Sequence, residues 1–288
     1  MTISLKSGST TLKTLEKIYR TDCNFELHSN AYSAVNKGAA ILNERIKSHE
    51  AIYGVNTGFG KLASVRIDDA NLVALQRNLV RSHSAGFGKP IPINVVRLMI
   101  ALKCISLGRG ASGVRPIVIQ KLQGLVEADI IPVIPEKGSV GASGDLAPLA
   151  HMASVLIGEG EVFYKGNRMA TAKAMQAAGF DPIELQAKEG LALLNGTQAS
   201  TALALAGLFG AWHLAVASLT TTALSIDAAM GSSAPFHDEI HQLRGHRGQI
   251  DSASRLRALM DRSEIRQSHQ EGDERVKIPT VFGAPRKL

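Results

Sequence analysis

The longest stretch without a charged side chain sets the tightest limit on how this chain can fold. Residues 190–226 contain no Asp, Glu, Lys or Arg. An apolar segment of this length is either a membrane span or a helix that protein surrounds on all sides. Ser, Thr, Gly and His recur on nearly every turn, and no cluster of Lys or Arg flanks either end, as a membrane span would favour. We therefore expect residues 190–226 to form the buried axis of a soluble helical bundle, with no membrane contact.

The charge of the chain is positive but evenly spread. The formal net charge of the 288 residues is +7, and a basic surface would favour nucleic acid. However, basic and acidic residues alternate between Arg244 and Arg275, and no aromatic side chains that could stack on bases interleave with them. We therefore expect no nucleic-acid partner. The use of only two cysteines, Cys23 and Cys104, and an N-terminus without an apolar signal core indicate a reduced, cytoplasmic location.

Apolar periodicity and capping residues predict a mainly helical protein. The length allows one large domain or two closely packed ones. Prolines make residues 131–135 extended, and β-branched and aromatic residues between glycines predict a small hairpin over 158–166. Helices are expected over 9–19, 30–49, 68–82, 92–107, 115–128 and 147–156.

A glycine-rich loop at 138–144 precedes the last of these helices. Its three glycines allow a tight turn with positive φ. Asp145 can cap the helix that follows, and Pro148 would lie in the first helical turn, where a missing N–H does no harm. The sequence therefore predicts a tight loop that leads into a helix N-terminus, where free N–H groups attract electron-rich groups.

The tripeptide Ala142-Ser143-Gly144 within this loop can convert itself into an electrophile. If the turn presses the Gly144 nitrogen against the Ala142 carbonyl carbon, ring closure and dehydration of Ser143 release two waters and leave a methylidene-imidazolone. Glycine offers the least hindered amide for this attack, and serine offers the hydroxyl that leaves. Ala-Ser-Gly alone is common in ordinary loops, so the residues around it decide its meaning.

The surrounding residues, Gly-Ser-Val-Gly-Ala-Ser-Gly-Asp-Leu-Ala-Pro-Leu-Ala-His at 138–151, closely resemble the signature of the histidine and phenylalanine ammonia-lyases. The resemblance implies a 4-methylidene-imidazol-5-one group made from Ala142, Ser143 and Gly144, with no metal and no external cofactor. It also implies the mainly helical fold of ammonia-lyases and fumarases, in which an N-terminal helical domain leads into long bundle helices. A homotetramer, in which several subunits build each site, is implied as well.

Three further positions resemble functional residues of this family. Tyr53, in the glycine-rich loop 53–61, matches the catalytic base, although such a tyrosine can also brace a turn. Ser82-His83 resembles the histidine-specific members, so His83 would bind the substrate imidazole; a histidine at a helix end can also satisfy terminal carbonyls. Asn195 matches a polar contact to the substrate amine or the ring, whereas Asn-Gly pairs also end helices in the left-handed conformation.

Two other motifs suggest binding functions that their details exclude. Gly60-Lys61 suggests a phosphate-binding loop, but the chain lacks the glycine and the Ser or Thr that this motif needs at the flanking positions. His237 and His241 are one helical turn apart, but Asp rather than Glu follows the first histidine, and no further ligand cluster follows at a recognised spacing. We therefore predict neither a nucleotide site nor a metal site.

The resemblance covers about residues 9–276 and then stops. Family members continue with a Gln-Asp-x-Tyr-Ser-x-Arg element and further bundle helices, which supply a carboxylate-binding arginine, a second tyrosine and an acidic residue. One allowed set of codons from Val276 onward, read in another frame, encodes Glu-Asp-Pro-Tyr-Ser-Leu-Arg-Cys, which is nearly that element. We expect residues 277–288 to be an aberrant, disordered tail that arises from a frameshift, in a truncated copy or through a sequencing error.

These observations together predict three regions and one activity. Residues 1–188 form an N-terminal domain with the active-site loops, residues 189–276 begin the central bundle, and residues 277–288 form the tail. The predicted activity is elimination of ammonia from L-histidine to give trans-urocanate. The alternatives are a phenylalanine or tyrosine ammonia-lyase, an aminomutase that uses the same ring, and an inactive truncated helical fragment.

Overall fold

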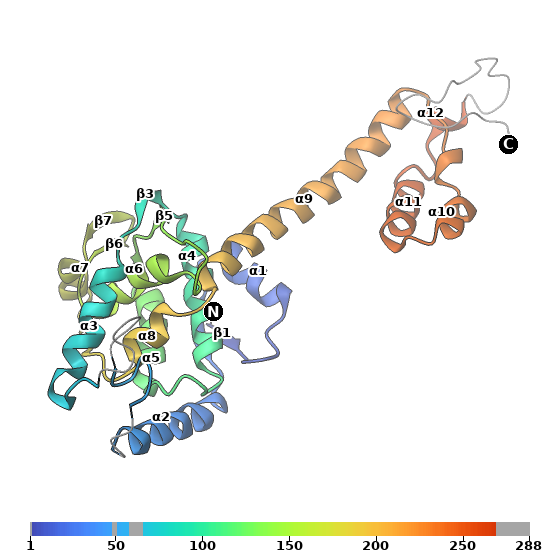
Figure 1. The fold of residues 1–288 in the computed structure, drawn as a ribbon. Coiled ribbons are helices and arrows are strands. Elements are labelled where there is room, and N and C mark those ends of the chain that lie inside the picture. The colour runs from blue at the N-terminus through green and yellow to red at the C-terminus, as the bar shows by residue number, and fades with distance from the viewer. Residues whose placement is uncertain (1, 48–50, 58–65, 269–288) are drawn as a thin grey trace. The chain divides into compact units, whose positions relative to one another are not determined.

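Helices form most of the chain, as the sequence predicts (Figure 1). The computed structural model describes residues 2–47, 51–57 and 66–268, so the predicted tail lies outside the described residues. The chain divides into two compact units, a first that runs to Ala206 and a second that begins at Gly207.

The first unit combines helices with short strands (Figure 1). The helices expected from the sequence correspond to α1 to α6, of which the third begins with a short 3-10 turn. In chain order the elements are β1 (Thr2–Leu5), α1 (Leu12–Arg20), β2 (Asn24–Leu27), α2 (Ala31–Lys47), η2 (Asp69–Asn71), α3 (Leu72–His83), β3 (Phe87–Pro90), α4 (Ile93–Leu107), α5 (Pro116–Glu127), β4 (Ile130–Pro132), β5 (Pro135–Lys137), α6 (Leu146–Leu156), β6 (Glu161–Tyr164), β7 (Asn167–Ala170), α7 (Thr171–Ala178), α8 (Glu189–Leu194) and the start of α9 (Gln198–Ala228).

The core of the first unit forms around α4, α5 and α6. Leu98 and Ile100 of α4, Leu122 of α5 and Leu149 of α6 are fully buried. α4 is apolar on nearly all sides, and most of its residues are buried. It packs against α1, α5 and β4. α6 packs against α3 and α8. These contacts bring together the ends of helices that carry the predicted site residues.

The short strands follow the sequence-based prediction only in part. Residues 131–135 are extended as expected, but they divide between β4, which pairs with β6, and β5, which pairs with β3. A hairpin forms from β6 and β7, with its turn at Lys165 and Gly166, but it runs over residues 161–170 rather than the predicted 158–166. β1 pairs in parallel with β2, which the sequence does not predict because four-residue strands are too short to show a clear alternation. The buried side chains of this pair are Ile3, Leu5, Phe25 and Leu27.

A buried carboxylate connects α8 to the start of α5. The Glu189 side chain is 2% exposed, and its oxygens accept hydrogen bonds from the Arg115 guanidinium at 2.8 Å. They also accept from the main-chain N–H groups of Arg115 and Gln186, at 3.0 and 2.8 Å. This full set of donors offsets the loss of water around the charge.

Glu189→Gln is expected to lower the free energy of unfolding by about 3 kcal/mol, because it leaves the Arg115 guanidinium without its anion in a partly buried place. Urea unfolding followed by circular dichroism measures this change. Glu184→Gln is the matched control, since the Glu184 side chain is exposed and the main-chain carbonyl that Arg115 contacts is unchanged. Equal stability of the two variants would show that the buried pair contributes nothing.

The boundary between the two units differs from the predicted one. It lies between Ala206 and Gly207, inside α9, rather than between residues 188 and 189. The physical reason is that α8 packs against α3 and α6, and that Ala202 at the start of α9 is fully buried. Both segments therefore belong to the first unit.

The second unit holds the rest of α9 and the helices that follow it (Figure 1). A small core forms where Ala223 and Ile226 of α9 pack with Leu256 and Met260. This core joins α9 to α11 within the unit. The elements after α9 are η3 (Ala234–Phe236), α10 (Asp238–Arg244), α11 (Arg247–Leu259) and α12 (Glu264–Gln267).

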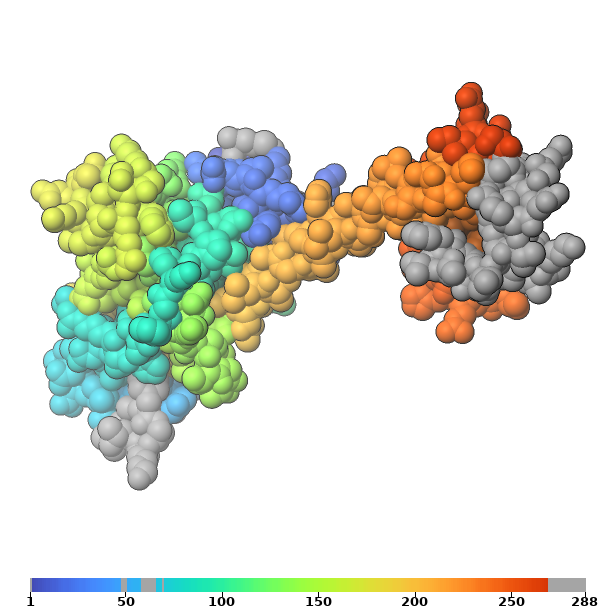
Figure 2. Space-filling view, turned by 90° about the horizontal axis from the view of Figure 1, so that it is seen from above, coloured from blue at the N-terminus to red at the C-terminus, as the bar shows by residue number. Residues whose placement is uncertain are grey.

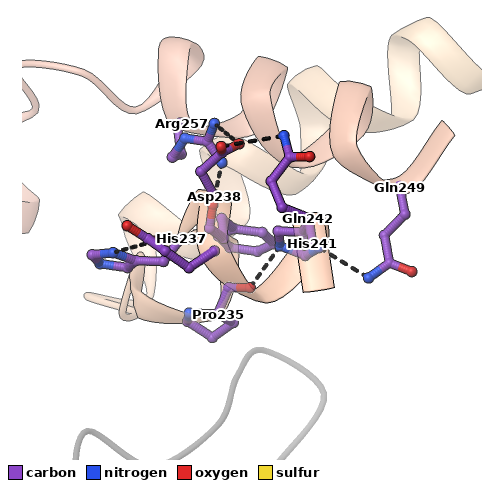
Figure 3. Close-up of polar contacts among 9 residues, drawn as sticks. Pro235, His237, Asp238, His241, Gln242, Gln249 and Arg257 are labelled. Carbon is purple, nitrogen blue, oxygen red and sulfur yellow. Dashed lines mark hydrogen bonds and ion pairs between the residues drawn. The ribbon is translucent and has the colours of Figure 1, made fainter. Parts of the chain in front are cut away.

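Figure 3 shows the polar contacts of α10. Nε2 of His241 donates a hydrogen bond to the Pro235 carbonyl, and Nδ1 accepts one from the Gln249 amide, each at 2.9 Å. Both ring nitrogens of His241 are thus engaged in holding the unit together. His237 is exposed, and its Nδ1 lies 4.0 Å from the Glu239 carboxylate. Within the part of the chain that the structure describes, no group of three His, Cys, Asp or Glu residues could hold a metal ion.

Helix α9, gold to orange in Figure 2, has many exposed apolar side chains. By length and composition it could cross a membrane: its mean hydropathy reaches 1.7, and 11% of that window is buried. Leu208, Trp212 and Leu214 are 47%, 64% and 69% exposed. Large contiguous patches of exposed apolar side chains mark surfaces that contact a partner or a membrane. The role of the stretch as a bundle axis therefore stays a prediction.

Candidate active site

The predicted reactive loop is a tight turn at the start of α6. Gly141 and Gly144 have φ angles of +66° and +92°, which residues with a side chain rarely adopt. Ala142 and Ser143, between them, are exposed. Pro148 lies in the first turn of α6, as expected. The loop therefore has the glycine-dependent bend on which the predicted cyclisation depends.

Gly144 is held against Gly196, just after α8. The two residues form a parallel bridge, and the N–H of Asp145 donates a hydrogen bond to the Gly196 carbonyl at 2.7 Å. A Cβ atom at position 144 would lie 2.3 Å from that oxygen, so glycine alone fits there. The same bridge places Asn195, a predicted substrate contact, next to the loop.

Asp145 has a different role from the predicted one. It precedes α6, but its side chain makes no capping hydrogen bond there. Its buried carboxylate instead accepts hydrogen bonds from the Ser139 hydroxyl at 2.8 Å, from the Ser200 N–H at 2.7 Å and from the Ser200 hydroxyl. Ser200 lies in the first turn of α9, where the helix dipole favours an anion. The prediction that Asp145 caps α6 is therefore wrong, and the carboxylate links the loop to α9.

The starts of α6 and α9 consequently meet beside the loop. α6 begins two residues after Gly144, and α9 begins two residues after Gly196. Main-chain N–H groups at helix starts can stabilise negative charge that develops during a reaction. An electron-accepting group at 142–144 would thus be favoured by the start of α6, whereas the start of α9 holds the Asp145 carboxylate.

Asn195 ends α8 and is exposed. Its φ and ψ angles are −83° and 129°, so its backbone is extended, and the positive φ of the turn, +141°, falls on Gly196. The alternative interpretation, a left-handed asparagine that ends the helix, therefore does not apply. The Asn195 N–H donates to the Leu191 carbonyl at 2.9 Å, which leaves the side chain at the surface beside the loop.

Lys103 contributes to this site, although the sequence analysis does not single it out. It is 1% exposed, and its Nζ donates hydrogen bonds to the carbonyls of Asn195 and Ala192, at 2.9 and 3.2 Å. These carbonyls lie at the C-terminal end of α8, where the helix dipole favours a cation. The available signal is that it is the one charged residue in the run 98–107.

Burial lowers the pKa of Lys103 to about 7. In the unfolded chain a lysine titrates at about 10.4, so between these values the folded state binds fewer protons and stability rises with pH. Lys103→Met is expected to remove this rise, which reaches up to about 1.4 kcal/mol per pH unit. Urea unfolding at several pH values across this window measures it. An identical pH dependence for the variant and the parent chain would show that the ammonium group is not buried.

His83 is the last residue of α3 and is half-buried. Its Nδ1 lies 2.9 Å from the Leu79 carbonyl and so donates to it, which leaves Nε2 of the neutral ring as an acceptor. The N–H of Gly86 donates to Nε2 of His151 at 3.0 Å, and burial lowers the pKa of His151, which favours this acceptor form. A Cβ atom on Gly138 would lie 3.2 Å from the Gly86 Cα. The segment after His83 is therefore packed against the start of the reactive loop.

Tyr53 is placed by a separate set of contacts. It is 60% exposed and begins a turn in which Asn56 is fully buried. The Asn56 side chain accepts a hydrogen bond from the Ile52 N–H at 2.7 Å, and its carbonyl accepts one from the Ile67 N–H at 2.8 Å. The structure thus brings together Gly144, Asn195 and the segment beside His83, whereas the position of Tyr53 depends on its own turn. Residues 58–61 of the predicted loop 53–61 lie outside the described residues.

Comparison with known proteins gives consistent matches. The family model "Aromatic amino acid lyase" matches residues 10–281. A tyrosine aminomutase from Streptomyces globisporus is 37% identical, with a TM-score of 0.85 over 91% of this chain and 49% of that one. A histidine ammonia-lyase from Trypanosoma cruzi is 34% identical, with a TM-score of 0.83 over 90% and 50%. A phenylalanine aminomutase from Pantoea agglomerans is 31% identical, with a TM-score of 0.86 over 96% and 55%.

This chain spans about half the length of these solved structures. It shares their fold over nearly all of its own length, and ammonia-lyases and aminomutases both occur among them. The matches therefore identify the family without selecting one activity or one substrate. On the family match and on these structures together, the chain belongs to the aromatic amino acid lyase family.

Proposed function

We propose that this chain carries the catalytic loop of an ammonia-lyase that converts L-histidine to trans-urocanate and ammonia. The observation that supports this most directly is the bend at Ala142-Ser143-Gly144, with a positive φ at Gly144 and a contact to Gly196 that no side chain tolerates. Such a bend favours attack of the Gly144 nitrogen on the Ala142 carbonyl carbon. The resulting methylidene-imidazolone would supply an electrophile, without a metal or an added cofactor.

The other residues of the site have roles that follow from their chemistry. Tyr53 takes a proton from the β-carbon of the substrate, which requires its phenol to ionise. Asn195 offers an amide that can bind the substrate amino group. The start of α6 beside the loop stabilises negative charge that develops there.

His83 supports histidine as the substrate. Because its Nδ1 donates to the Leu79 carbonyl, its Nε2 can accept a hydrogen bond from an imidazole N–H, which phenylalanine does not possess. The second candidate is an aminomutase or a lyase for phenylalanine or tyrosine. It is favoured by the solved structures of a tyrosine and a phenylalanine aminomutase at 37% and 31% identity.

The exposure of the loop supports an oligomeric enzyme. Ser143 is exposed, and so is the apolar surface of α9 at Trp212 and Leu214. Exclusion of water from an electrophile strengthens the electrostatic interactions at the site and prevents side reactions. We propose a cytoplasmic homotetramer in which neighbouring subunits cover both surfaces. The alternative for the 288-residue chain by itself is an inactive helical fragment.

Two measurements on the purified chain test the proposal. Intact-mass analysis is expected to show a mass lower than that of the translated sequence by two waters. Incubation with L-histidine, L-phenylalanine and L-tyrosine, followed by separation of the products, is expected to give urocanate from histidine alone. A β-amino acid product would identify an aminomutase, and cinnamate or coumarate would identify a phenylalanine or tyrosine lyase. An unmodified mass without any product would leave the inactive fragment.

A further inference from the structure

Lys103 of α4 is an ionisable side chain in a place where an apolar side chain would pack equally well. Lys103 is 1% exposed, and nearby Leu98 and Ile100 of the same helix are fully buried. Burying an ammonium group costs free energy unless hydrogen bonds replace its water. An unbranched apolar side chain would fill a similar volume without that cost, and such replacements are often neutral or stabilising. The charge at this position therefore calls for a separate explanation.

The hydrogen bonds of Lys103 supply one, because they end on the turn that supports the reactive loop. Nζ binds the Asn195 carbonyl at 2.9 Å. The next residue, Gly196, accepts the Asp145 N–H at 2.7 Å and forms the bridge to Gly144. The path from the ammonium group to the loop thus passes through two hydrogen bonds, with Gly196 between them. Gly196 has a φ of +141°, so this turn relies on surrounding contacts to keep its shape.

The Asp145 carboxylate also acts electrostatically on Lys103. The carboxylate of Asp145 is buried beside the start of α9, and its charge raises the pKa of Lys103 against the larger, opposite effect of burial. When Lys103 is protonated, its ammonium group and the Asp145 carboxylate therefore attract one another across the turn. Removal of the Lys103 ammonium group would take away its hydrogen bonds to the turn, while the Asp145 carboxylate would stay in place.

We propose that Lys103 is a positioning residue for the reactive loop: its ammonium group fixes the Asn195–Gly196 turn, which keeps Gly144 bent and Asn195 beside it. This inference rests on the proposed function, since the bend matters because the ring forms there. Lys103 acts through the main chain of the turn rather than on the substrate.

Two substitutions at Lys103 separate stability from ring formation, because the variant that is expected to be more stable is expected to form less of the ring. Lys103→Met keeps the length of the side chain and removes the charge, so the variant should fold at least as stably as Lys103→Arg, which overpacks the core. Lys103→Arg retains the charge and the donors, so it should form more of the ring than Lys103→Met. If Lys103 only fills space, ring formation should instead follow stability.

The experiment compares the full 288-residue chain with K103M, K103R and the matched control K121M. Lys121 also donates Nζ to a main-chain carbonyl, that of Asp181 at 2.7 Å, but from α5. Intact mass gives the fraction of chains that have lost two waters, and near-ultraviolet absorption of the ring gives a second record. Hydrogen exchange of peptides covering 139–149 and 192–200 reports on the turn whether or not the ring forms. Urea unfolding shows which variants are folded.

We expect folded K103M to exchange about tenfold faster than the parent chain in both segments, and to form the ring about tenfold more slowly, because a charged donor to two carbonyls is lost. K121M should match the parent chain, and K103R should lie between K103M and the parent chain.

Unchanged exchange in folded K103M would overturn the proposal. If K103M does not fold, a folded K103R decides: retention of the ring supports the proposal, and its loss overturns it. A parent chain that never loses two waters would instead disprove the proposed function, and hydrogen exchange would still decide the role of Lys103.

Discussion

Ser143→Ala is expected to abolish the loss of two waters and to lower the rate of ammonia release by about a thousandfold or more. Serine supplies the hydroxyl that leaves on dehydration, and alanine leaves only an unreactive methyl group in its place. Because Ser143 is exposed, removal of its hydroxyl opens no cavity in the core, and the fold should persist. Intact mass and the initial rate with L-histidine, measured on one preparation, check both parts of this expectation.

Ser33→Ala is the matched control for this variant. Ser33 is an exposed serine in α2, so the same chemical change there should leave the mass difference and the rate of the parent chain. A Ser143→Ala chain that still lost two waters would contradict the assignment of the loop as the catalyst. Full ammonia release from Ser143→Ala would contradict it equally.

Gly144→Ala is expected to lower the free energy of unfolding by about 2–5 kcal/mol, from strain at positive φ and from overpacking. The φ angle at this position is +92°, and the new methyl group would lie 2.3 Å from the Gly196 carbonyl oxygen. The bridge between the loop and the turn must then open, so the ring should also fail to form. Urea unfolding measures the first effect, and intact mass measures the second.

Gly141→Ala separates these two causes within the same loop. Gly141 also has a positive φ, +66°, but a Cβ atom there would meet nothing within 4 Å. This variant should therefore lose only about 1–2 kcal/mol from backbone strain, and it should still form the ring. Equal losses in the two variants would show that the contact between Gly144 and Gly196 contributes nothing to the bend.

The parts of the fold that depend on neighbouring residues could be predicted from the sequence. The helices from α1 to α6 follow from apolar spacing, and the turn at 138–144 follows from its glycines. The pairing of β1 with β2 could not be predicted, because strands of four residues have too few positions to show an alternation of apolar and polar residues. The role of Asp145 was mistaken for a similar reason: a carboxylate before a helix predicts a cap, but its real partner, Ser200, comes much later in the chain.

In the candidate site, too, some features could be predicted from the sequence and others depend on tertiary packing. By itself the sequence determined the Ala142-Ser143-Gly144 tripeptide for which cyclisation is predicted, the tight loop that holds it and the helix that follows, because each depends on residues a few positions apart. Only the tertiary structure decided which distant groups hold that loop in place, since contacts made by the packing of α4, α6, α8 and α9 leave no periodic trace in one sequence. Those contacts join Gly144 to Gly196, Asp145 to Ser200 and Lys103 to Asn195.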